Sequence, residues 1–335
     1  MTSEFVRITT EGRLGRVLLD RPAALNALDL GMIRALQAAL DGFAAQPRVH
    51  VIAIAGAGGR AFCAGGDIRA IRAHAMAGEM DAVHDFFAEE YALNAAIAAC
   101  PVPYVALIDG ICMGGGIGVS VHGGIRVATE AATFAMPETA IGFFPDIGAS
   151  YFLPRLPGAL GFYLGLTGSR VVGADAVHAG LATHFVPREG LAALEADLAR
   201  DGATAVATHA APLPPFTLAP HRDAIDRCFG RDSVPAILAA LEAEGTEWAR
   251  ATLTTLRAMS PASLLWSHRL ITEGAGRDLR ACLDAELALS LRVTRHADFA
   301  EGVRAMVVDK DRAPRWTPAR IEDVDAAAIA ALAGV

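Results

Sequence analysis

From Tyr104 to Gly118 the chain reads "YVALIDGICMGGGIG". The apolar run Tyr104–Ile108 is typical of a buried strand, and the glycines after it predict a tight turn that opens a short helix. Ile125–Ala128 follows as another apolar run of strand length. A strand, a glycine turn, a helix and a further strand are the pattern of an α/β protein, so this stretch decides the fold class.

The segments before this stretch extend the same pattern. Asp29 is expected to cap a helix, because Leu30, Ile33, Leu36, Leu40 and Phe43 recur at helical spacing after it. We predict the other elements as a hairpin of Phe5–Thr10 with Leu14–Asp20, a buried strand at Val49–Ala55 and a long helix near Asp81–Ala99.

The second half of the chain changes character after four prolines, Pro212, Pro214, Pro215 and Pro220. From Ala224 to Val307 the pattern is mostly helical. We therefore predict an α/β core over residues 1–200, a Pro-rich linker over 201–220 and a helical C-terminal region over 221–335 that packs on the core.

Composition and charge exclude several classes of protein. The 335 residues are 53% hydrophobic and 20% charged, with a formal net charge of −8, which argues against a surface for nucleic acid or for an anionic membrane. Pro101 and Pro103 interrupt the apolar run Ala92–Ile108, so no membrane span is predicted. Five scattered cysteines without CxxC spacing indicate reduced thiols. With no signal-like N-terminal segment, we expect a cytoplasmic protein.

Several reactive residue types stand in weak motifs. "GAGGRA", Gly56–Ala61, resembles a dinucleotide-binding loop, but no amphipathic helix follows it, and we interpret it as a tight turn. Ser120 and His122 do not form a nucleophile elbow, and Cys63 and Cys112 lack a neighbouring His or a second Cys. We interpret all four as packing residues. The only lysine, Lys310, lies in a polar turn and is poorly placed for a Schiff base.

Glu138 and Asp146 stand out because each follows a proline in the otherwise apolar stretch "FAMPETAIGFFPDIGASYFLP". Two glycine loops, Phe62–Asp67 and Met113–Gly118, each follow a predicted strand and precede a predicted helix start. Backbone amides from two such loops can converge on one carbonyl oxygen as an oxyanion hole. Close chain packing would explain either loop taken alone. Taken together with Glu138 and Asp146, the two loops predict a site in which amides donate to an oxyanion and carboxylates activate water or attack the substrate.

Four segments resemble the crotonase (enoyl-CoA hydratase/isomerase) superfamily in order and spacing: "RPAALNAL", "AFCAGGDI", "GICMGGGIG" and "MPETAIGFFPDIG". Further segments are similar to its 3-hydroxyisobutyryl-CoA hydrolase branch, which acts in valine degradation: "FFAEEY", "SVHG", "YFLPRL" and "FAEGVRAMVVDKDRAPRW". The resemblance extends from about Phe5 to Trp316. It implies a crotonase-like spiral of repeated ββα units with a helical C-terminal region, and an acyl-CoA substrate bound with CoA in a bent shape.

The resemblance also implies roles for individual residues. Ala64 and Gly115 match the positions whose amides form the oxyanion hole. Arg60 or Arg69 is expected to meet a CoA phosphate. The positions that match segments lining the CoA groove are Ala24, Leu25, Asp67, Ile68 and Arg69.

Departures from the hydratase pattern indicate the reaction. Hydratases of this family place one acid two residues past the glycine triplet, where this chain has Gly118, and a second acid at the position of Glu138. Where a hydratase has glycine, this chain has Asp146. One acid of a water-activating pair is missing, so hydration is disfavoured and hydrolysis of the thioester is predicted. "GAS" at Gly148–Ser150 replaces a more glycine-rich run and is expected to reshape the acyl pocket.

We expect Glu138 to act as nucleophile, forming a mixed anhydride, or as general base, and Asp146 to orient and protonate. Glu90 matches a position that lines the substrate site, and Glu89 is its solvated neighbour. The alternatives are an enoyl-CoA hydratase or isomerase and a catalytically silent CoA-binding scaffold. No metal and no cofactor besides the substrate's CoA is expected, and the family's assemblies make a homotrimer or homohexamer the expected oligomer.

Overall fold

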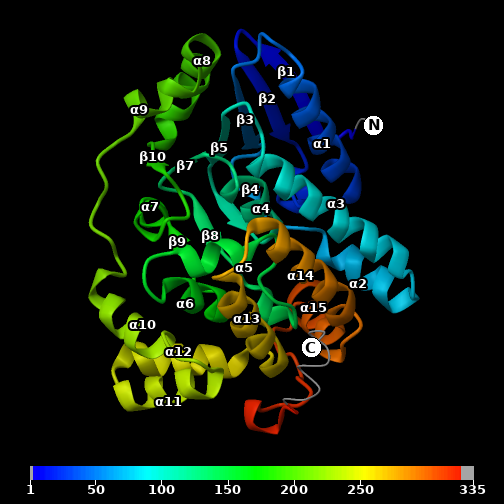
Figure 1. Cartoon of the computed structure of the whole chain (residues 1–335), viewed down its shortest axis with the longest axis vertical. Coiled ribbons are helices and arrows are strands. Elements are labelled where there is room, and N and C mark those ends of the chain that lie inside the picture. Colours follow the sequence, from blue (N-terminus) through cyan, green and yellow to red (C-terminus); the bar gives the residue numbers. More distant parts are fainter. Residues whose placement is uncertain (1–2, 326–335) are drawn as a thin grey trace. The chain divides into compact units, whose positions relative to one another are not determined.

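A computed structural model describes residues 3–325 and divides them into two compact units. Figure 1 labels the elements along the chain. Unit 1 consists of the chain up to Asp67, Glu89–Phe134 and Val171–Thr217, and unit 2 of Ile68–Ala88, Ala135–Arg170 and the chain from Leu218. Each unit thus combines separate stretches, because the chain leaves each unit and later returns to it. The predicted division into 1–200, 201–220 and 221–335 follows chain order instead, and its last ten residues lie outside the described part.

Unit 1 contains both β-sheets. Its strands are β1 (Val6–Glu11), β2 (Leu14–Leu19), β3 (Val51–Gly56), β4 (Ala61–Cys63), β5 (Tyr104–Ile108), β6 (Ile111–Met113), β7 (Ile125–Ala128), β8 (Thr133–Ala135, whose last residue opens a stretch of unit 2), β9 (Val171–Val172) and β10 (His184–Phe185). Its helices are η1 (Pro22–Ala24), α1 (Leu30–Ala44), α4 (Gly115–Val121), α7 (Asp175–Ala179), η4 (Arg188–Gly190), α8 (Leu191–Asp201), η5 (Gly202–Thr204) and α9 (Ala205–His209).

Strand order confirms the predicted ββα repeats. The larger sheet has the order β1-β2-β3-β5-β7-β10, and the smaller sheet has the order β4-β6-β8-β9. The strands β3, β5 and β7 belong to the larger sheet, and the strand that follows each of them belongs to the smaller one. A helix follows each pair along the chain: α2 (Ile68–Ala77), α4 and η2 (Glu138–Ile141). The hairpin β1–β2 is antiparallel, whereas the other pairs in the larger sheet are parallel.

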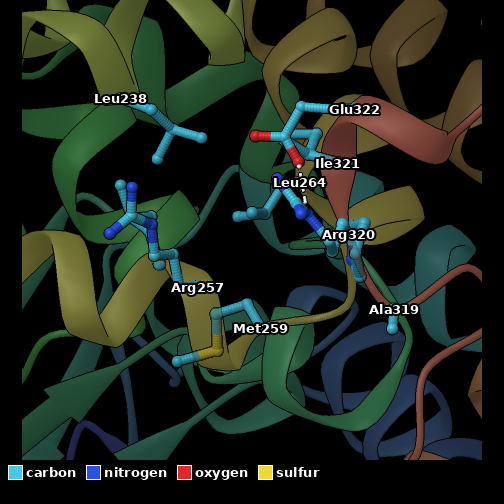
Figure 2. A pocket seen from close by; sticks show the side chains of 10 residues that line it. Leu238, Arg257, Met259, Leu264, Ala319, Arg320, Ile321 and Glu322 are labelled. Carbon is cyan, nitrogen blue, oxygen red and sulfur yellow. Dashed lines mark hydrogen bonds and ion pairs between the residues drawn. The ribbon is translucent and has the colours of Figure 1, made fainter.

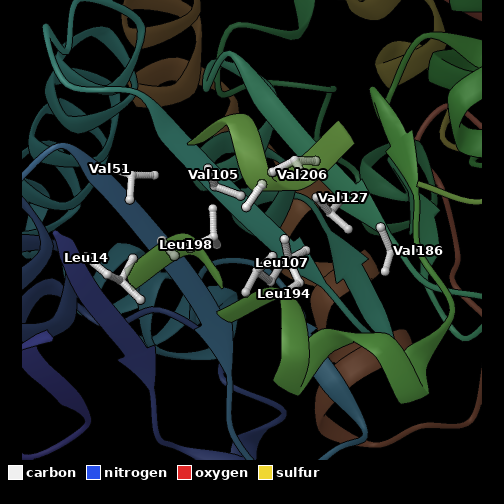
Figure 3. Close-up of a cluster of buried hydrophobic side chains, with 11 residues drawn as sticks. Leu14, Val51, Val105, Leu107, Val127, Val186, Leu194, Leu198 and Val206 are labelled. Carbon is white, nitrogen blue, oxygen red and sulfur yellow. The ribbon is translucent and has the colours of Figure 1, made fainter. Parts of the chain in front are cut away.

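Helices α8 and α9 cover one face of the larger sheet with an apolar cluster (Figure 3). The cluster joins Leu14 of β2, Val51 of β3 and Leu107 of β5 to Leu194 and Leu198 of α8. Side chains alternate between the two faces of a strand, so Gly15, next to Leu14, faces the other side. A Cβ atom on Gly15 would lie 2.7 Å from the ring of Phe43, which places α1 on that second face.

Unit 2 is mostly helical. Its other elements are α5 (Ala149–Phe152), η3 (Leu153–Arg155), α6 (Leu160–Thr167), η6 (Ala219–His221), α10 (Arg222–Phe229), α11 (Val234–Glu244), α12 (Glu247–Ala258), α13 (Pro261–Gly274), α14 (Leu279–Val293), α15 (Ala297–Val303), η7 (Arg304–Val308) and η8 (Ile321–Asp323). Helix α3 (Met80–Ala98) contributes its residues up to Ala88 to unit 2 and the rest to unit 1.

The segment predicted as a linker, 201–220, is partly helical. Residues 202–209 form η5 and α9, and Val206 of α9 is buried in the cluster of Figure 3. No helix or strand is assigned from Ala210 to Leu218, the part that contains Pro212, Pro214 and Pro215. Proline has no N–H to donate to a helix, so the segment without a helix or strand is the part that contains these three prolines.

Candidate active site

Gly115 lies among the predicted site residues of unit 1. It is the first residue of α4 and follows Gly114, whose φ of 46° is left-handed. Glu90, on the part of α3 that belongs to unit 1, is only 2% exposed. A Cβ atom on Gly115 would collide with Oε1 of Glu90 and would lie 3.1 Å from the backbone nitrogen of Gly66. The amides of Gly66 and Gly115 therefore lie close to a buried carboxylate, and glycine is required at this position.

The neighbouring acid, Glu89, has a different environment. Its carboxylate forms an ion pair with Arg34 of α1 at 2.6 Å, and its side chain is 35% exposed. Because successive helical residues point in different directions, Glu89 lies at the surface while Glu90 points inward. The two glutamates therefore do not form one solvated helix face.

The amide that lies beside Gly115 differs from the one predicted from the sequence. The N–H of Ala64, the predicted donor, is bonded to the carbonyl oxygen of Leu25 at 3.0 Å. Leu28 donates to Gly65 O and accepts from the N–H of Asp67, both at 2.8 Å, and so forms a single parallel bridge centred on Gly66. In such a bridge the central residue directs its own N–H away from the pairing strand. The Gly66 amide, not that of Ala64, is thus beside Gly115.

The turn around Ala24 and Leu25 precedes α1 in unit 1. Ala24 ends η1, and Leu25 has a left-handed φ of 53°. The fully buried Asn26 fixes this turn, since its side-chain oxygen accepts from the Arg21 N–H at 2.9 Å and its side-chain nitrogen donates to Ala61 O at 2.9 Å. Asn26 belongs to the segment "RPAALNAL", but the sequence pattern there did not indicate this bracing role.

The other predicted groove residues belong to different units. Asp67 is the last residue of its stretch in unit 1 and forms an ion pair with Arg21 at 3.0 Å. Ile68 and Arg69 begin α2 in unit 2, where Arg69 is exposed. Arg60, just before β4, is also exposed. Both arginines considered as phosphate ligands are thus accessible.

The two predicted acids lie on one loop of unit 2, between β8 and α5. Glu138 begins η2, and the residues Glu138 and Asp146 are each 6% exposed. Between them lie the buried rings of Phe143 and Phe144, which stack with centroids 4.5 Å apart. Burial in these apolar surroundings is costly for carboxylates, which is typical of acids with a chemical role.

Residues near α13 and α15 hold the turn that follows Glu138. The N–H of Ser260 donates to Thr139 O at 3.1 Å, and its hydroxyl donates to the Asp298 carboxylate at 2.7 Å. Gly142 has a left-handed φ of 70°, and a Cβ atom there would collide with the carbonyl oxygen of Asp298. The backbone on the C-terminal side of Glu138 is therefore fixed from two directions.

The structure adds Glu286 of α14, an acid that no sequence motif indicated. Its side chain is fully buried and accepts hydrogen bonds from Gly148 N at 2.6 Å, Ser150 N at 2.9 Å and the Ser150 hydroxyl at 2.5 Å. Burial raises the pKa of Glu286 to about 8; these hydrogen bonds lower it, and the charge of Asp146 raises it further. Its helical spacing from the buried Leu283 and Val293 is a sequence signal for an acid on an apolar face.

Glu286→Gln is expected to change how stability depends on pH. The folded-state pKa of about 8 lies above the usual value of 4.5, so the contribution of Glu286 to stability is complete below pH 4.5 and is lost as the pH rises to about 8. The slope approaches about 1.4 kcal/mol per pH unit. Denaturant unfolding from pH 5 to pH 8 measures it. The free energy of unfolding is expected to fall less with rising pH in Glu286→Gln than in wild type, and to fall as in wild type in Glu273→Gln, on α13. Parallel curves for wild type and Glu286→Gln would contradict the expectation.

Cys63, Cys112 and Ser120, interpreted as packing residues, have the expected environments. Burial raises the pKa of the Cys63 thiol to about 12 and raises that of Cys112 as well, so neither thiol is activated. The Ser120 hydroxyl donates to Gly116 O and Ile117 O, both at 3.0 Å, within its own helix. Within residues 3–325, no three His, Cys, Asp or Glu side chains are grouped to hold a metal ion.

A cavity of about 320 Å³ in unit 2 contains none of the predicted site residues (Figure 2). Two arginines at this cavity already have partners, since Arg320 pairs with Glu322 at 3.3 Å and Arg257 pairs with Glu242 at 2.5 Å. The remaining lining residues are Leu238, Leu256, Met259, Pro261, Leu264, Ala319 and Ile321. We assign no ligand to this cavity.

Among the described helices, none has the length and apolar composition needed to cross a membrane.

The ββα repeats and the glycine loops define the class of protein. A family model described as enoyl-CoA hydratase/isomerase matches residues 14–333, and the chain belongs to this family. It is 48% identical over 329 residues to the mitochondrial 3-hydroxyisobutyryl-CoA hydrolase of Xenopus tropicalis, covering 95% of this chain and 85% of the relative. It is 46% identical over 334 residues to the human protein of that name, covering 96% and 86%.

Solved structures agree on the fold. A carnitinyl-CoA dehydratase from Mycobacterium thermoresistibile is 37% identical with a TM-score of 0.95, covering 99% of this chain and 97% of that chain. An enoyl-CoA hydratase from Rhodobacter sphaeroides is 39% identical with a TM-score of 0.92 and the same coverage. The predicted crotonase-like α/β fold is confirmed.

Proposed function

We propose that this protein hydrolyses the thioester of 3-hydroxyisobutyryl-CoA, a step of valine degradation, to 3-hydroxyisobutyrate and CoA. The observation that carries the proposal is the pair of buried carboxylates on one loop, Glu138 and Asp146. The position where a hydratase would have its other acid is Gly118, buried within α4. The curated relatives named 3-hydroxyisobutyryl-CoA hydrolase, from 44% to 48% identical, support the choice of acyl group.

We assign the chemical roles as follows. The amides of Gly66 and Gly115 donate hydrogen bonds to the thioester oxygen, whose negative charge grows as the carbonyl carbon is attacked. Glu138 either attacks that carbon, forming a mixed anhydride that water then cleaves, or removes a proton from the attacking water. Asp146 protonates the CoA sulfur as the C–S bond breaks. The groove residues Ala24, Leu25, Asp67, Ile68 and Arg69 bind the CoA part.

A second candidate is hydration of an enoyl-CoA, favoured by the likeness to the enoyl-CoA hydratase of Rhodobacter sphaeroides. One assay separates the candidates: the protein is incubated with 3-hydroxyisobutyryl-CoA and with crotonyl-CoA while free thiol and enoyl absorbance are followed. Thiol release from the first substrate supports the hydrolase. Loss of enoyl absorbance without thiol release would contradict it in favour of the hydratase, and no change in either would indicate a silent CoA-binding scaffold.

Glu90→Ala is expected to reduce the preference for a hydroxylated acyl group. We assign the buried Glu90 carboxylate beside Gly115 as the acceptor for the substrate hydroxyl. An acceptor that binds a hydroxyl disfavours analogues that lack it. The measurement is the ratio of kcat/KM for 3-hydroxyisobutyryl-CoA to kcat/KM for isobutyryl-CoA. The ratio is expected to fall in Glu90→Ala and to stay unchanged in the Glu89→Ala control; an equal ratio in Glu90→Ala and wild type would contradict the role.

We further infer a reducing compartment, since the five cysteines are free thiols. Our proposal is the cytoplasm, whereas the relatives quoted above are named mitochondrial. We also propose that no cofactor or metal is needed besides the CoA of the substrate, and that the protein forms a homotrimer or homohexamer. Light scattering with size-exclusion chromatography measures the assembly, and activity in the presence of a chelator tests the metal.

A further inference from the structure

Glu286 is a buried acid that the proposed reaction does not use. Its Oε2 atom accepts from Gly148 N at 2.6 Å, and its Oε1 atom accepts from the N–H and the hydroxyl of Ser150 at 2.9 Å and 2.5 Å. All three donors belong to the segment that directly follows Asp146. A carboxyl group is costly to bury unless hydrogen bonds compensate it, and here the bonds all go to one loop.

The backbone of that loop has an unusual conformation that needs support. Ile147 has a φ of 57° and Gly148 a φ of 80°, both left-handed. A β-branched residue is strained in this region and remains there only when its surroundings impose it. Gly148 is the N-cap of α5 and has no side chain to cap the helix. Instead, the oxygens of the Glu286 carboxyl group, on α14, accept hydrogen bonds from the backbone N–H groups of Gly148 and Ser150.

Electrostatics also couples Glu286 to Asp146. The charge of Asp146 contributes to the raised pKa of Glu286. Cys282, one turn earlier on α14, also interacts electrostatically with Glu286, and its thiol interacts with Arg155 and Arg277 as well.

We propose that Glu286 is a positioning residue for Asp146. By accepting three hydrogen bonds from Gly148 and Ser150 it holds the backbone after Asp146, and so it sets the direction in which Asp146 presents its carboxyl group. Glu286 itself does not touch the substrate. This inference rests on the proposed hydrolysis, in which Asp146 protonates the leaving sulfur.

A double-mutant cycle tests the proposal. Above pH 8, where the Glu286 carboxyl group is ionised and both of its oxygens accept, Glu286→Gln keeps the volume of the side chain but places an NH₂ group where one of the two backbone N–H donors needs an acceptor. With 3-hydroxyisobutyryl-CoA, we expect kcat to fall by roughly 10-fold to 100-fold with KM nearly unchanged, because a small misplacement of a reacting group can cost about 10²-fold. In the Asp146→Asn background the same change is expected to lower kcat by less than about 2-fold, since the residue that it positions is already inactive.

Each outcome decides the proposal. An equal loss of kcat in both backgrounds, or wild-type kcat in Glu286→Gln, would overturn it. If Glu286→Gln does not fold, Ser150→Ala decides, because it removes one hydrogen bond and leaves both backbone donors: lower kcat at unchanged KM supports the proposal, and wild-type kcat overturns it. Glu273→Gln is the control. A wild-type protein that releases no thiol would instead contradict the proposed function.

Discussion

Glu138→Gln is expected to lower kcat for 3-hydroxyisobutyryl-CoA by roughly 10²–10⁴-fold while KM stays nearly unchanged. Glutamine has the same shape but can neither attack the carbonyl carbon nor remove a proton from water. The loop is expected to keep its conformation, because the stacked rings of Phe143 and Phe144 and the bond from Ser260 to Thr139 do not involve the carboxylate. The loss should therefore be chemical rather than structural.

Single-turnover and steady-state rates of thiol release measure this effect, with thermal unfolding as the check on the fold. Glu242→Gln on α11 is a suitable control, because it changes an acid that lies outside the proposed site and pairs with Arg257. Near-wild-type turnover in Glu138→Gln would remove Glu138 from the mechanism. A large rise in KM with unchanged kcat would instead assign Glu138 to binding.

Asp146→Asn is expected to lower kcat by a similar factor, roughly 10²–10⁴-fold. Asparagine cannot protonate the sulfur that leaves, and the buried position of Asp146, 6% exposed, limits replacement of that proton by bulk water. Binding of the CoA part involves other residues in our assignment, so KM is expected to change little.

A more acidic leaving group separates the roles of the two acids. A thiophenol ester of 3-hydroxyisobutyrate releases a thiolate that needs no proton, so the loss in Asp146→Asn relative to wild type should shrink with this substrate. The loss in Glu138→Gln should persist, because attack on the carbonyl is still required. Equal losses of kcat in both variants with both substrates would contradict the assignment of attack to Glu138 and of sulfur protonation to Asp146.

The fold was largely predictable because its signals are local. Tyr104–Ile108 and Ile125–Ala128 are buried strands because each is a short apolar run, and Asp29 caps α1 by accepting from Met32 N at 2.8 Å. The part of the predicted linker before the prolines is helical because α9 packs on the sheet, a tertiary contact with no local signal.

Motifs named the candidate site residues. The structure shows that Glu90, Glu138 and Asp146 are buried, and their roles stay predictions. Which amide accompanies Gly115 depends on the bridge between Leu28 and Gly66, a pairing between separate segments that the glycine motif alone does not specify.

The hydrogen bonds from the Asp146 loop to Glu286 have a consequence for biosynthesis. The acceptor lies 138 residues after its donor Gly148 in the chain. A ribosome adds about 5–20 residues per second, so on the order of ten seconds passes before the loop can meet its support. During that interval the nascent chain already contains both acids but lacks the group that holds the left-handed turn after Asp146. Completion of this loop is therefore a late event of synthesis, and a chain that stops before α14 would carry the acids without it.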